Sequence, residues 1–219
     1  MTIELEQGSW EWKLARCGKA TGSRIADAVD RLKKGGWSAR ARDYLDELVS
    51  ERLTGIPCDH FVSHDMQWGI DREDEACDYY TFLLDEPLDR IGFVPHPHIP
   101  MSGASPDRLL INAPGLVQVK CPKTHNHMKL WHRGEINPDY IIQCQWEMAC
   151  RPEREFCDFI SFDPRVSDDF KLWRKRLYRD EKMITELERE VSAFLDIVNG
   201  EVEAFRAKHN LDESELVAA

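Results

Sequence analysis

Several features are missing from this sequence, and each absence excludes a class of protein. It has no apolar run long enough to cross a membrane, and its N-terminus lacks a basic segment followed by an apolar one. We therefore expect no membrane span and no signal peptide. None of the seven cysteines stands in a C-x-x-C pair, which argues against a zinc ribbon and gives no support for an iron–sulfur cluster. We expect reduced, mostly buried thiols of a cytoplasmic protein.

A surplus of positive charge is also missing. The chain has 29 Lys and Arg against 40 Asp and Glu, which gives a net charge of −11, whereas DNA-binding proteins usually carry a basic footprint. Many of the acids lie in residues 181–215. The basic residues gather in three groups: Arg31, Lys33, Lys34, Arg40 and Arg42; Lys123, Lys129 and Arg133; and Lys171, Arg174, Lys175, Arg176 and Arg179. Each group taken singly is more typical of a solvated helix or strand face.

Length and periodicity predict one domain over residues 1–219, of the α/β (α+β) class, with a central mixed β-sheet flanked by helices. Helices are expected over residues 22–34, 38–54, 66–84 and 138–150, and strands near residues 91–94, 107–111, 116–120, 156–162 and 170–178. The third helix is expected to turn Ala76, Tyr80 and Leu83 to one face. From Glu181 a helical apolar stripe follows: Ile184, Leu187, Val191, Phe194 and Val198.

The chemistry is concentrated in Ser105-Pro106-Asp107 and in Gln118-Val119-Lys120, eleven residues further on. Gln118 and Lys120 are two apart, so a strand places both on one face, where Asp107 of a partner strand can meet them. A carboxylate, an amide oxygen and a lysine on adjacent strands suit an Mg²⁺ site for phosphodiester hydrolysis. The alternative is an ordinary β-hairpin with a solvated lysine and an exposed aspartate.

Further residues appear in a fixed order around this pair: Arg16 and Ser23 near the N-terminus, Glu73 in an expected helix, and Gln143 downstream. Together with the motif they resemble the family of phage lambda exonuclease and the YqaJ-type viral recombinases, within the PD-(D/E)xK nuclease superfamily. The resemblance runs from about Trp10 to about Arg206. The chain departs from the pattern at Gln118, where the family has Asp or Glu.

The resemblance implies a restriction-endonuclease-like core and an Mg²⁺-dependent 5′→3′ exonuclease that acts on linear double-stranded DNA. Such an enzyme leaves 3′ single-stranded tails for homologous recombination by strand annealing. The implied partner is a phage-type single-strand annealing protein, and the implied assembly is a homo-oligomer, a ring-shaped trimer. The implied source is a bacterium or its prophage.

The resemblance also assigns roles to residues. Two Mg²⁺ ions, with Mn²⁺ as the alternative, would be held by the metal ligands Asp107, Gln118, Val119 (through its backbone carbonyl) and Glu73. Lys120 would orient or deprotonate the attacking water. The 5′-terminal phosphate would be held by the group Arg16, Ser23, Ser105 and Gln143. Met66 stands where the family places an apolar wedge that parts the first base pairs.

Alternatives remain open from the sequence. The same core occurs in restriction and repair endonucleases, which do not depend on a DNA end. The amide at Gln118 could mark a catalytically weakened DNA-end-binding protein, because it carries no negative charge. The sequence contains two closely spaced histidine pairs, His96 with His98 and His125 with His127. A structural zinc site would need more ligands than these pairs provide.

Overall fold

The computed structural model describes residues 5–58 and 63–209, which group into two compact units. The first unit comprises residues 5–58, 92–105 and 180–209, and the second comprises residues 63–91 and 106–179. Each unit contains its own β-sheet. The sequence-based expectation of one domain over residues 1–219 stays a prediction.

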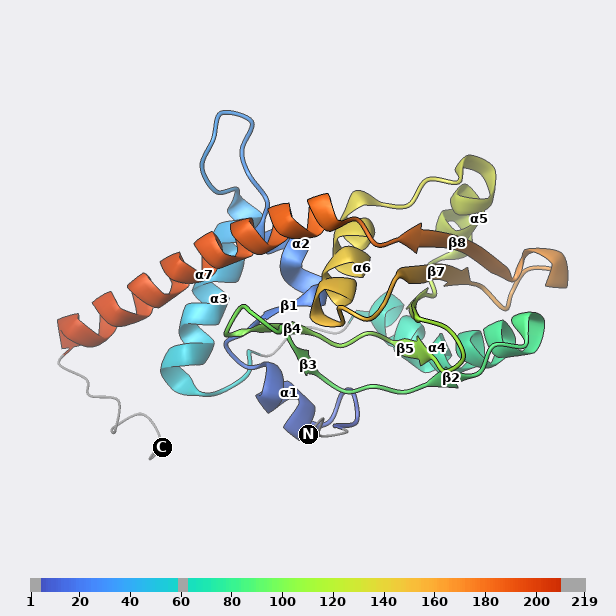
Figure 1. The fold of residues 1–219 in the computed structure, drawn as a ribbon, viewed down its shortest axis with the longest axis horizontal. Coiled ribbons are helices and arrows are strands. Elements are labelled where there is room, and N and C mark those ends of the chain that lie inside the picture. The colour runs from blue at the N-terminus through green and yellow to red at the C-terminus, as the bar shows by residue number, and fades with distance from the viewer. Residues whose placement is uncertain (1–4, 59–62, 210–219) are drawn as a thin grey trace. The chain divides into compact units, whose positions relative to one another are not determined.

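The first unit combines helices with a small sheet (Figure 1). Its helices are α1 (Trp10–Arg16), η1 (Gly22–Arg24), α2 (Ile25–Ala28), α3 (Ala39–Thr54) and α7 (Glu181–His209). Its strands are β1 (Ala20–Thr21), β3 (Val94–Pro95) and β4 (Ser102–Ala104), in the order β1-β4-β3. β1 runs parallel to β4, and β3 runs antiparallel to it.

Two of the predicted helices form as the sequence indicates, and they lie side by side (Figure 1). Ser38 caps α3 by accepting a hydrogen bond from the backbone N–H of Ala41, and Gly55 ends it in a left-handed conformation with φ of 68°. The predicted apolar stripe of α7 is buried. The ring of Phe194 stacks on Tyr44 of α3 with a centroid distance of 5.7 Å.

The helix predicted over residues 22–34 is wrong beyond Ala28, where α2 ends. The chain turns back at Gly35 and Gly36, whose φ angles of 87° and 85° favour glycine. Arg31 pairs with Trp37 across this turn and lays its guanidinium over the indole ring. The predicted strand at residues 91–94 is likewise shorter, because only Val94 and Pro95 of β3 pair with β4.

The second unit is built on a five-stranded mixed sheet in the order β2-β5-β6-β7-β8. The strands are β2 (Leu88–Asp89), β5 (Arg108–Leu110), β6 (Gly115–Lys120), β7 (Phe156–Phe162) and β8 (Leu172–Tyr178). β6 and β7 run parallel, and the other neighbouring pairs run antiparallel. Gly115 permits a close approach between the parallel strands, because a Cβ there would lie 2.3 Å from the ring of Phe156.

The helices of this unit are α4 (His64–Leu84), α5 (Thr124–Arg133), α6 (Pro138–Cys150) and the short η2 (Asp168–Phe170). α4 buries Ala76, Cys77 and Tyr80 against a core that includes Val117 and Val119 of β6. Leu83, predicted on the same helix face, lies near the C-terminal end of α4 and is 50% exposed. The sequence predicted α4 and α6 well but missed α5 and the short strands β1, β2 and β4.

Two expectations from composition can be compared with the described residues. All seven cysteines are free in the structure and five of them are buried, which confirms the expectation of mostly buried cysteines. None of the helices in residues 5–58 and 63–209 has an apolar stretch long enough to cross a membrane.

Candidate active site

The two halves of the motif meet at the junction of β5 and β6 in the second unit. Asp107 immediately precedes β5, and the antiparallel register that pairs Arg108 with Val117 brings it beside Gln118. Oδ2 of Asp107 accepts two hydrogen bonds, from Nε2 of Gln118 at 2.6 Å and from the backbone N–H of Val119 at 2.7 Å. Asp107 is 9% exposed and Gln118 is 1% exposed. The alternative of an ordinary hairpin with an exposed aspartate is therefore wrong.

The environment of Asp107 favours its protonated form. Burial raises the pKa of its carboxyl to about 7, and the negative charge of Glu73 adds to this rise. Lys120, the Val119 N–H and Arg108 act in the opposite direction, because each stabilises the carboxylate. A buried carboxyl with such a raised pKa, beside a second acid and a lysine, is typical of a site that binds a cation.

Lys120 ends β6 and is half-buried. Its Nζ lies 3.5 Å from Oε1 of Gln143 on α6 and 5.0 Å from the centroid of the Tyr140 ring. Gln143 also contacts the motif directly, since its Nε2 donates to Oε1 of Gln118 at 3.0 Å. The structure thus brings Asp107, Gln118, Lys120 and Gln143 into one connected cluster.

Glu73 joins this cluster from α4. Its Oε1 accepts a hydrogen bond of 2.7 Å from Nη1 of Arg108, and the side chain is 30% exposed. Arg108 is almost fully buried, and it also donates to Asp74 and to the backbone carbonyl of Asp107. The arginine therefore ties the helix that carries Glu73 to the strand that follows Asp107.

Two residues of this cluster were missed by the sequence-based prediction. Arg108 directly follows the motif aspartate, and a charged residue inside an expected buried strand was the available signal. Glu147 accepts a hydrogen bond of 2.9 Å from Gln143 and is 1% exposed. The signal for Glu147 was its spacing, because residues four apart on a helix are neighbours.

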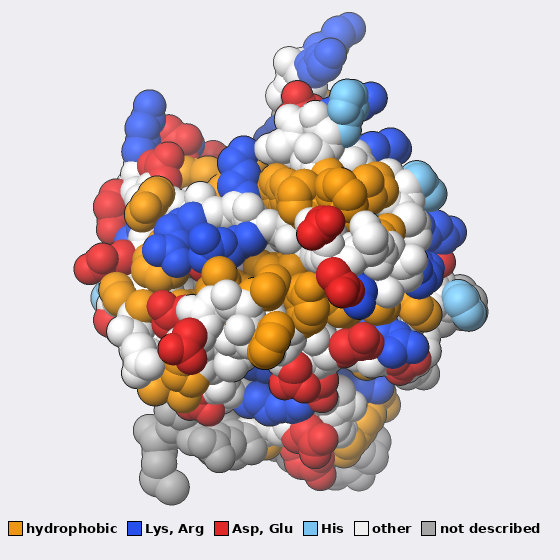
Figure 2. Space-filling view, turned by 90° about the vertical axis from the view of Figure 1, so that its right-hand side faces the viewer, with side chains coloured by type: hydrophobic (Ala, Val, Ile, Leu, Met, Phe, Trp, Pro, Cys, Tyr) orange, Lys and Arg blue, Asp and Glu red, His pale blue; other side chains and the backbone are white. Residues whose placement is uncertain are grey.

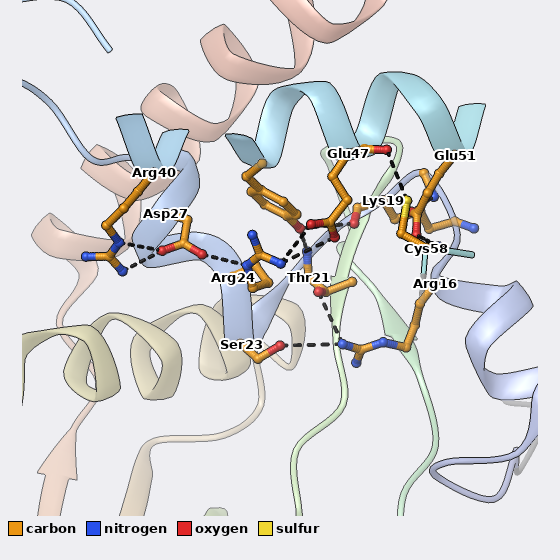
Figure 3. A network of polar contacts seen from close by, with 12 residues as sticks. Arg16, Lys19, Thr21, Ser23, Arg24, Asp27, Arg40, Glu47, Glu51 and Cys58 are labelled. Atoms are coloured by element: carbon orange, nitrogen blue, oxygen red, sulfur yellow. Dashed lines mark hydrogen bonds and ion pairs between the residues drawn. The ribbon is translucent and has the colours of Figure 1, made fainter. Parts of the chain in front are cut away.

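The other predicted phosphate ligands cluster in the first unit around Arg16. Its Nη1 donates to Oγ of Ser105 at 3.0 Å, and its Nη2 lies 3.2 Å from Oγ1 of Thr21 and 3.5 Å from Oγ of Ser23. Figure 3 shows the guanidinium reaching toward Thr21 and Ser23. The Trp12 ring lies 4.0 Å from the guanidinium carbon, and its indole N–H also donates to Ser105. Hydroxyl groups around a fixed guanidinium suit an anionic oxygen ligand.

Gln143 and Met66 belong to the second unit. Nε2 of Gln143 has two hydrogens, and it donates to Gln118 and to Glu147. To bind a phosphate oxygen through this NH₂ group, Gln143 must release one of these acceptors. Met66 lies in the first turn of α4, where Ser63 caps its backbone N–H, and its side chain is 53% exposed. An exposed apolar side chain at a helix start is compatible with a wedge.

The donor atoms of the cluster suit a hard cation. Carboxylate, amide and backbone carbonyl oxygens are the ligands that Mg²⁺ prefers. Asp107 and Glu73 carry carboxylates and Val119 has a backbone carbonyl, whereas Gln118 turns its NH₂ group to Asp107 and its oxygen to Gln143. Among the residues that the structure describes, no group of three or more His, Cys, Asp and Glu side chains is arranged to hold a metal ion.

His96 and His127 have side-chain and backbone partners within the protein. Nδ1 of His96 accepts from the backbone N–H groups of His98 and Ile99, and Nε2 lies 3.2 Å from the carboxylate of Glu188. The buried ring of His127 contacts Oγ of Ser161 and the carbonyl of Phe170. Both rings thus have partners within their own unit.

The third basic group is engaged within the second unit. Arg174 and Arg176 pair with the fully buried Asp158, and Lys171 pairs with Asp168. Lys175 and Arg179 donate to backbone carbonyls. Figure 2 shows one compact group of basic side chains on the left of the face it presents, and further basic side chains scattered among acidic ones.

Comparison with known proteins decides the family. The model of the YqaJ-like viral recombinase domain matches residues 11–152. The chain belongs to this family. The match includes Arg16, Glu73, Asp107, Lys120 and Gln143, so the resemblance inferred from the motifs is confirmed. A search among curated proteins gave no match.

Solved structures of similar proteins agree with the family. The alkaline exonuclease LHK-Exo from Laribacter hongkongensis is 38% identical, with a TM-score of 0.84 over 92% of this chain and 98% of that one. LHK-Exo in complex with dAMP gives the same identity and coverage, with a TM-score of 0.85. A phage-related exonuclease from Haemophilus somnus 129PT, at 15% identity and a TM-score of 0.64 over 85% of this chain and 96% of that one, shares the fold. The predicted restriction-endonuclease-like class, with a mixed sheet flanked by helices, is confirmed.

Proposed function

We propose that this protein is an Mg²⁺-dependent exonuclease that degrades linear double-stranded DNA in the 5′→3′ direction and leaves 3′ single-stranded tails for recombination. The observation that carries the proposal is the cluster of Asp107, Gln118 and Lys120 at the end of the β5–β6 pair, with Glu73 beside it. Membership of a viral recombinase family and the 38% identity to an alkaline exonuclease support the same function.

The chemistry follows from the residues of this cluster. Asp107, Glu73, Gln118 and the Val119 carbonyl would hold Mg²⁺, or Mn²⁺ in its place, with two ions per site. The cation would supply Lewis-acid activation of water and would neutralise charge on the phosphate. A residue in an antiparallel pair points its N–H and C=O to the same side. Since the N–H of Val119 faces Asp107, its carbonyl is directed to that side too.

Lys120 is the group best suited to act on the attacking water. It shares one strand face with Gln118, and its ammonium lies near Gln143 and Tyr140. A lysine there can orient the water, accept its proton when deprotonated, and stabilise the negative charge of the pentacovalent transition state. None of these tasks requires it to hold the cation.

The cluster around Arg16 would give the enzyme its polarity. A 5′-terminal phosphate carries more negative charge than an internal phosphodiester, and a guanidinium matches its oxygens with parallel N–H donors. Arg16, Ser23 and Ser105 converge on one position within the first unit, and Gln143, in the second unit, is the fourth residue that we assign to this phosphate. Met66 would part the first base pairs.

An acidic protein still needs positive charge where it meets the duplex. The helix α5 has no acidic residue, and helical periodicity places His125, Lys129, His132 and Arg133 on one exposed stripe. His127, on the opposite side of α5, is buried. This stripe follows the catalytic strand by a few residues and would bind backbone phosphates. If a ring-shaped homotrimer closes around the DNA, it needs even less affinity for the duplex. A single-strand annealing protein would then bind the 3′ tails.

The proposal is tested with linear duplexes that carry a 5′ phosphate or a 5′ hydroxyl, labelled at either end, with and without Mg²⁺. We expect Mg²⁺-dependent release of nucleotides from the 5′ strand of linear DNA, faster from phosphorylated ends, and no cleavage of closed circles. Cleavage of closed circles would favour a restriction-type or repair endonuclease. Binding to DNA ends without hydrolysis at any Mg²⁺ or Mn²⁺ concentration would favour a catalytically weakened end-binding protein. The neutral amide of Gln118 is the feature that motivates this alternative.

A further inference from the structure

Glu147 is a buried carboxylate behind the predicted metal site. It lies on α6 one turn after Gln143 and is 1% exposed. Its Oε1 accepts a hydrogen bond of 2.9 Å from Nε2 of Gln143. Burying a carboxylate is costly unless it is hydrogen-bonded, and an apolar residue would pack at this position without that cost. A role beyond packing is therefore indicated.

Glu147 is the first member of a chain of four side chains. Gln143 donates to Glu147 and, at 3.0 Å, to Oε1 of Gln118. Gln118 in turn donates from Nε2 to Oδ2 of Asp107 at 2.6 Å. The chain thus begins and ends at a carboxylate, and two amides link them. Because Glu147 accepts from one end of the Gln143 amide, it fixes which end faces Gln118, and through it the orientation of the Gln118 amide.

We infer that Glu147 is a positioning residue that orients the amides of Gln143 and Gln118. It also supplies a carboxylate close to the site, where the PD-(D/E)xK pattern would have one at position 118. The inference rests on the proposed function. The charge of a buried carboxylate is screened much less than that of an exposed one. A carboxylate at the far end of two amides therefore adds negative character to the cluster at Asp107, although position 118 itself is neutral.

The first test examines the hydrogen bonds in metal-free protein by NMR of ¹⁵N-labelled glutamine side chains. In the wild type, the NH₂ groups of Gln118 and Gln143 should exchange with solvent much more slowly than that of Gln67, an exposed glutamine that donates to Asp71. Glu147→Gln should shift the Gln118 and Gln143 resonances and leave that of Gln67 in place. Fast exchange of Gln143 in the wild type overturns the inference without any variant.

The second test measures Mn²⁺ binding directly by calorimetry, without DNA. Loss of a partner that orients a metal ligand typically weakens metal affinity by about 10-fold to 100-fold, and we expect a loss in this range for Glu147→Gln. The control is Glu153→Gln, which removes an exposed carboxylate of the same unit and should leave the affinity unchanged. The double variant Gln118→Glu/Glu147→Gln returns a carboxylate to position 118 and should recover most of the lost affinity.

These outcomes separate the inference from the proposed function. Unchanged Mn²⁺ affinity in Glu147→Gln, or no recovery in the double variant, overturns the role of Glu147 even if the protein is an exonuclease. No Mn²⁺ or Mg²⁺ binding by the wild type contradicts the proposed metal-dependent function, and the exchange rates in metal-free protein then still decide whether Glu147 orients the two amides.

Discussion

Gln118 donates a hydrogen bond of 2.6 Å from its amide nitrogen to Oδ2 of Asp107. A glutamate at position 118 would place two carboxylates at that distance, where like charges repel. The amide instead binds Asp107 with its donor end and accepts from Gln143 with its oxygen. In the metal-free protein the departure from the family pattern therefore stabilises the site. In the presence of a cation the same amide supplies a dipole and no charge.

Gln118→Glu should consequently have opposite effects in the two states. We expect it to lower the free energy of unfolding of metal-free protein by about 1–3 kcal/mol, because two carboxylates then meet in a buried site. It should also lower the Mg²⁺ concentration for half-maximal activity, because a third carboxylate attracts the cation. Thermal unfolding with and without Mg²⁺, and a Mg²⁺ titration of hydrolysis, measure the two effects.

Gln118→Ala removes both ends of the amide, so it should be less active than the wild type at every Mg²⁺ concentration. Its turnover also serves as the control for Gln118→Glu, whose turnover can move either way since tighter metal binding need not favour the transition state. A Gln118→Ala variant that followed the wild-type titration curve would show that Gln118 is not a ligand.

The raised pKa of Asp107, about 7, predicts a specific pH dependence. The folded protein keeps this proton to about pH 7, whereas the unfolded chain releases it near the ordinary pKa of about 3.9. The resulting contribution to stability is fully present below the unfolded pKa and is lost as pH rises through about 7. Denaturant unfolding between about pH 5 and 8 should show this loss in metal-free wild type, and Asp107→Asn should lack it.

Metal affinity should change with pH in the opposite direction to this stability. A cation displaces the proton of Asp107, so Mg²⁺ should bind more tightly as pH rises through about 7. Isothermal titration at several pH values checks this. An affinity that does not vary over that range would separate Asp107 from the metal.

Lys120→Ala should reduce hydrolysis by at least about 100-fold, as does the loss of a group that stabilises the transition state. The fold and the binding of DNA ends should persist, because the side chain is half-buried and its hydrogen bond to Gln143 is long, at 3.5 Å. The matched control is Lys123→Ala, which removes an exposed lysine paired with Asp65. Turnover near that of the wild type in Lys120→Ala would exclude the lysine from the mechanism.

Arg16→Ala should abolish most of the preference for 5′-phosphorylated ends. Hydrogen bonds to charged groups contribute about 1.5–3 kcal/mol, so we expect the rate ratio between phosphorylated and hydroxyl ends to fall by about 10-fold or more. Arg40→Ala is the control in the same unit, because Arg40 is exposed and pairs with Asp27 (Figure 3). Equal rates on both ends in the wild type would argue against the phosphate pocket.

The protein should assemble as a ring-shaped homotrimer. An enzyme with a net charge of −11 binds a polyanion poorly, and closure around the duplex would prevent its escape without strong attraction. Sedimentation equilibrium at micromolar concentration should show a mass three times that of the chain. A monomer as the single species would contradict the prediction.

Much of the fold was predictable because its signals are local. The boundaries of α6 coincide with the predicted residues 138–150, since Asn137 caps a segment that begins with proline. Ser38 as the N-cap and Gly55 as the left-handed C-cap mark the ends of α3 in the same local way. The helix over residues 22–34 failed because the turn at Gly35 and Gly36 and the contact between Arg31 and Trp37 override its helical pattern.

The sequence by itself determined which side chains of the motif share one face, because the placement of Asp107, Gln118 and Lys120 on paired strands follows from the two-residue period of a strand. Only the tertiary structure decided what surrounds that motif. Arg108 of β5 bridges to Glu73 on α4, and Gln143 of α6 links Glu147 to Gln118 on β6. These contacts join segments far apart in the chain, and the pKa of Asp107 depends on burial that only packing creates. Local patterns do not show which distant residues become partners, since burial and electrostatic interaction depend on distance in space.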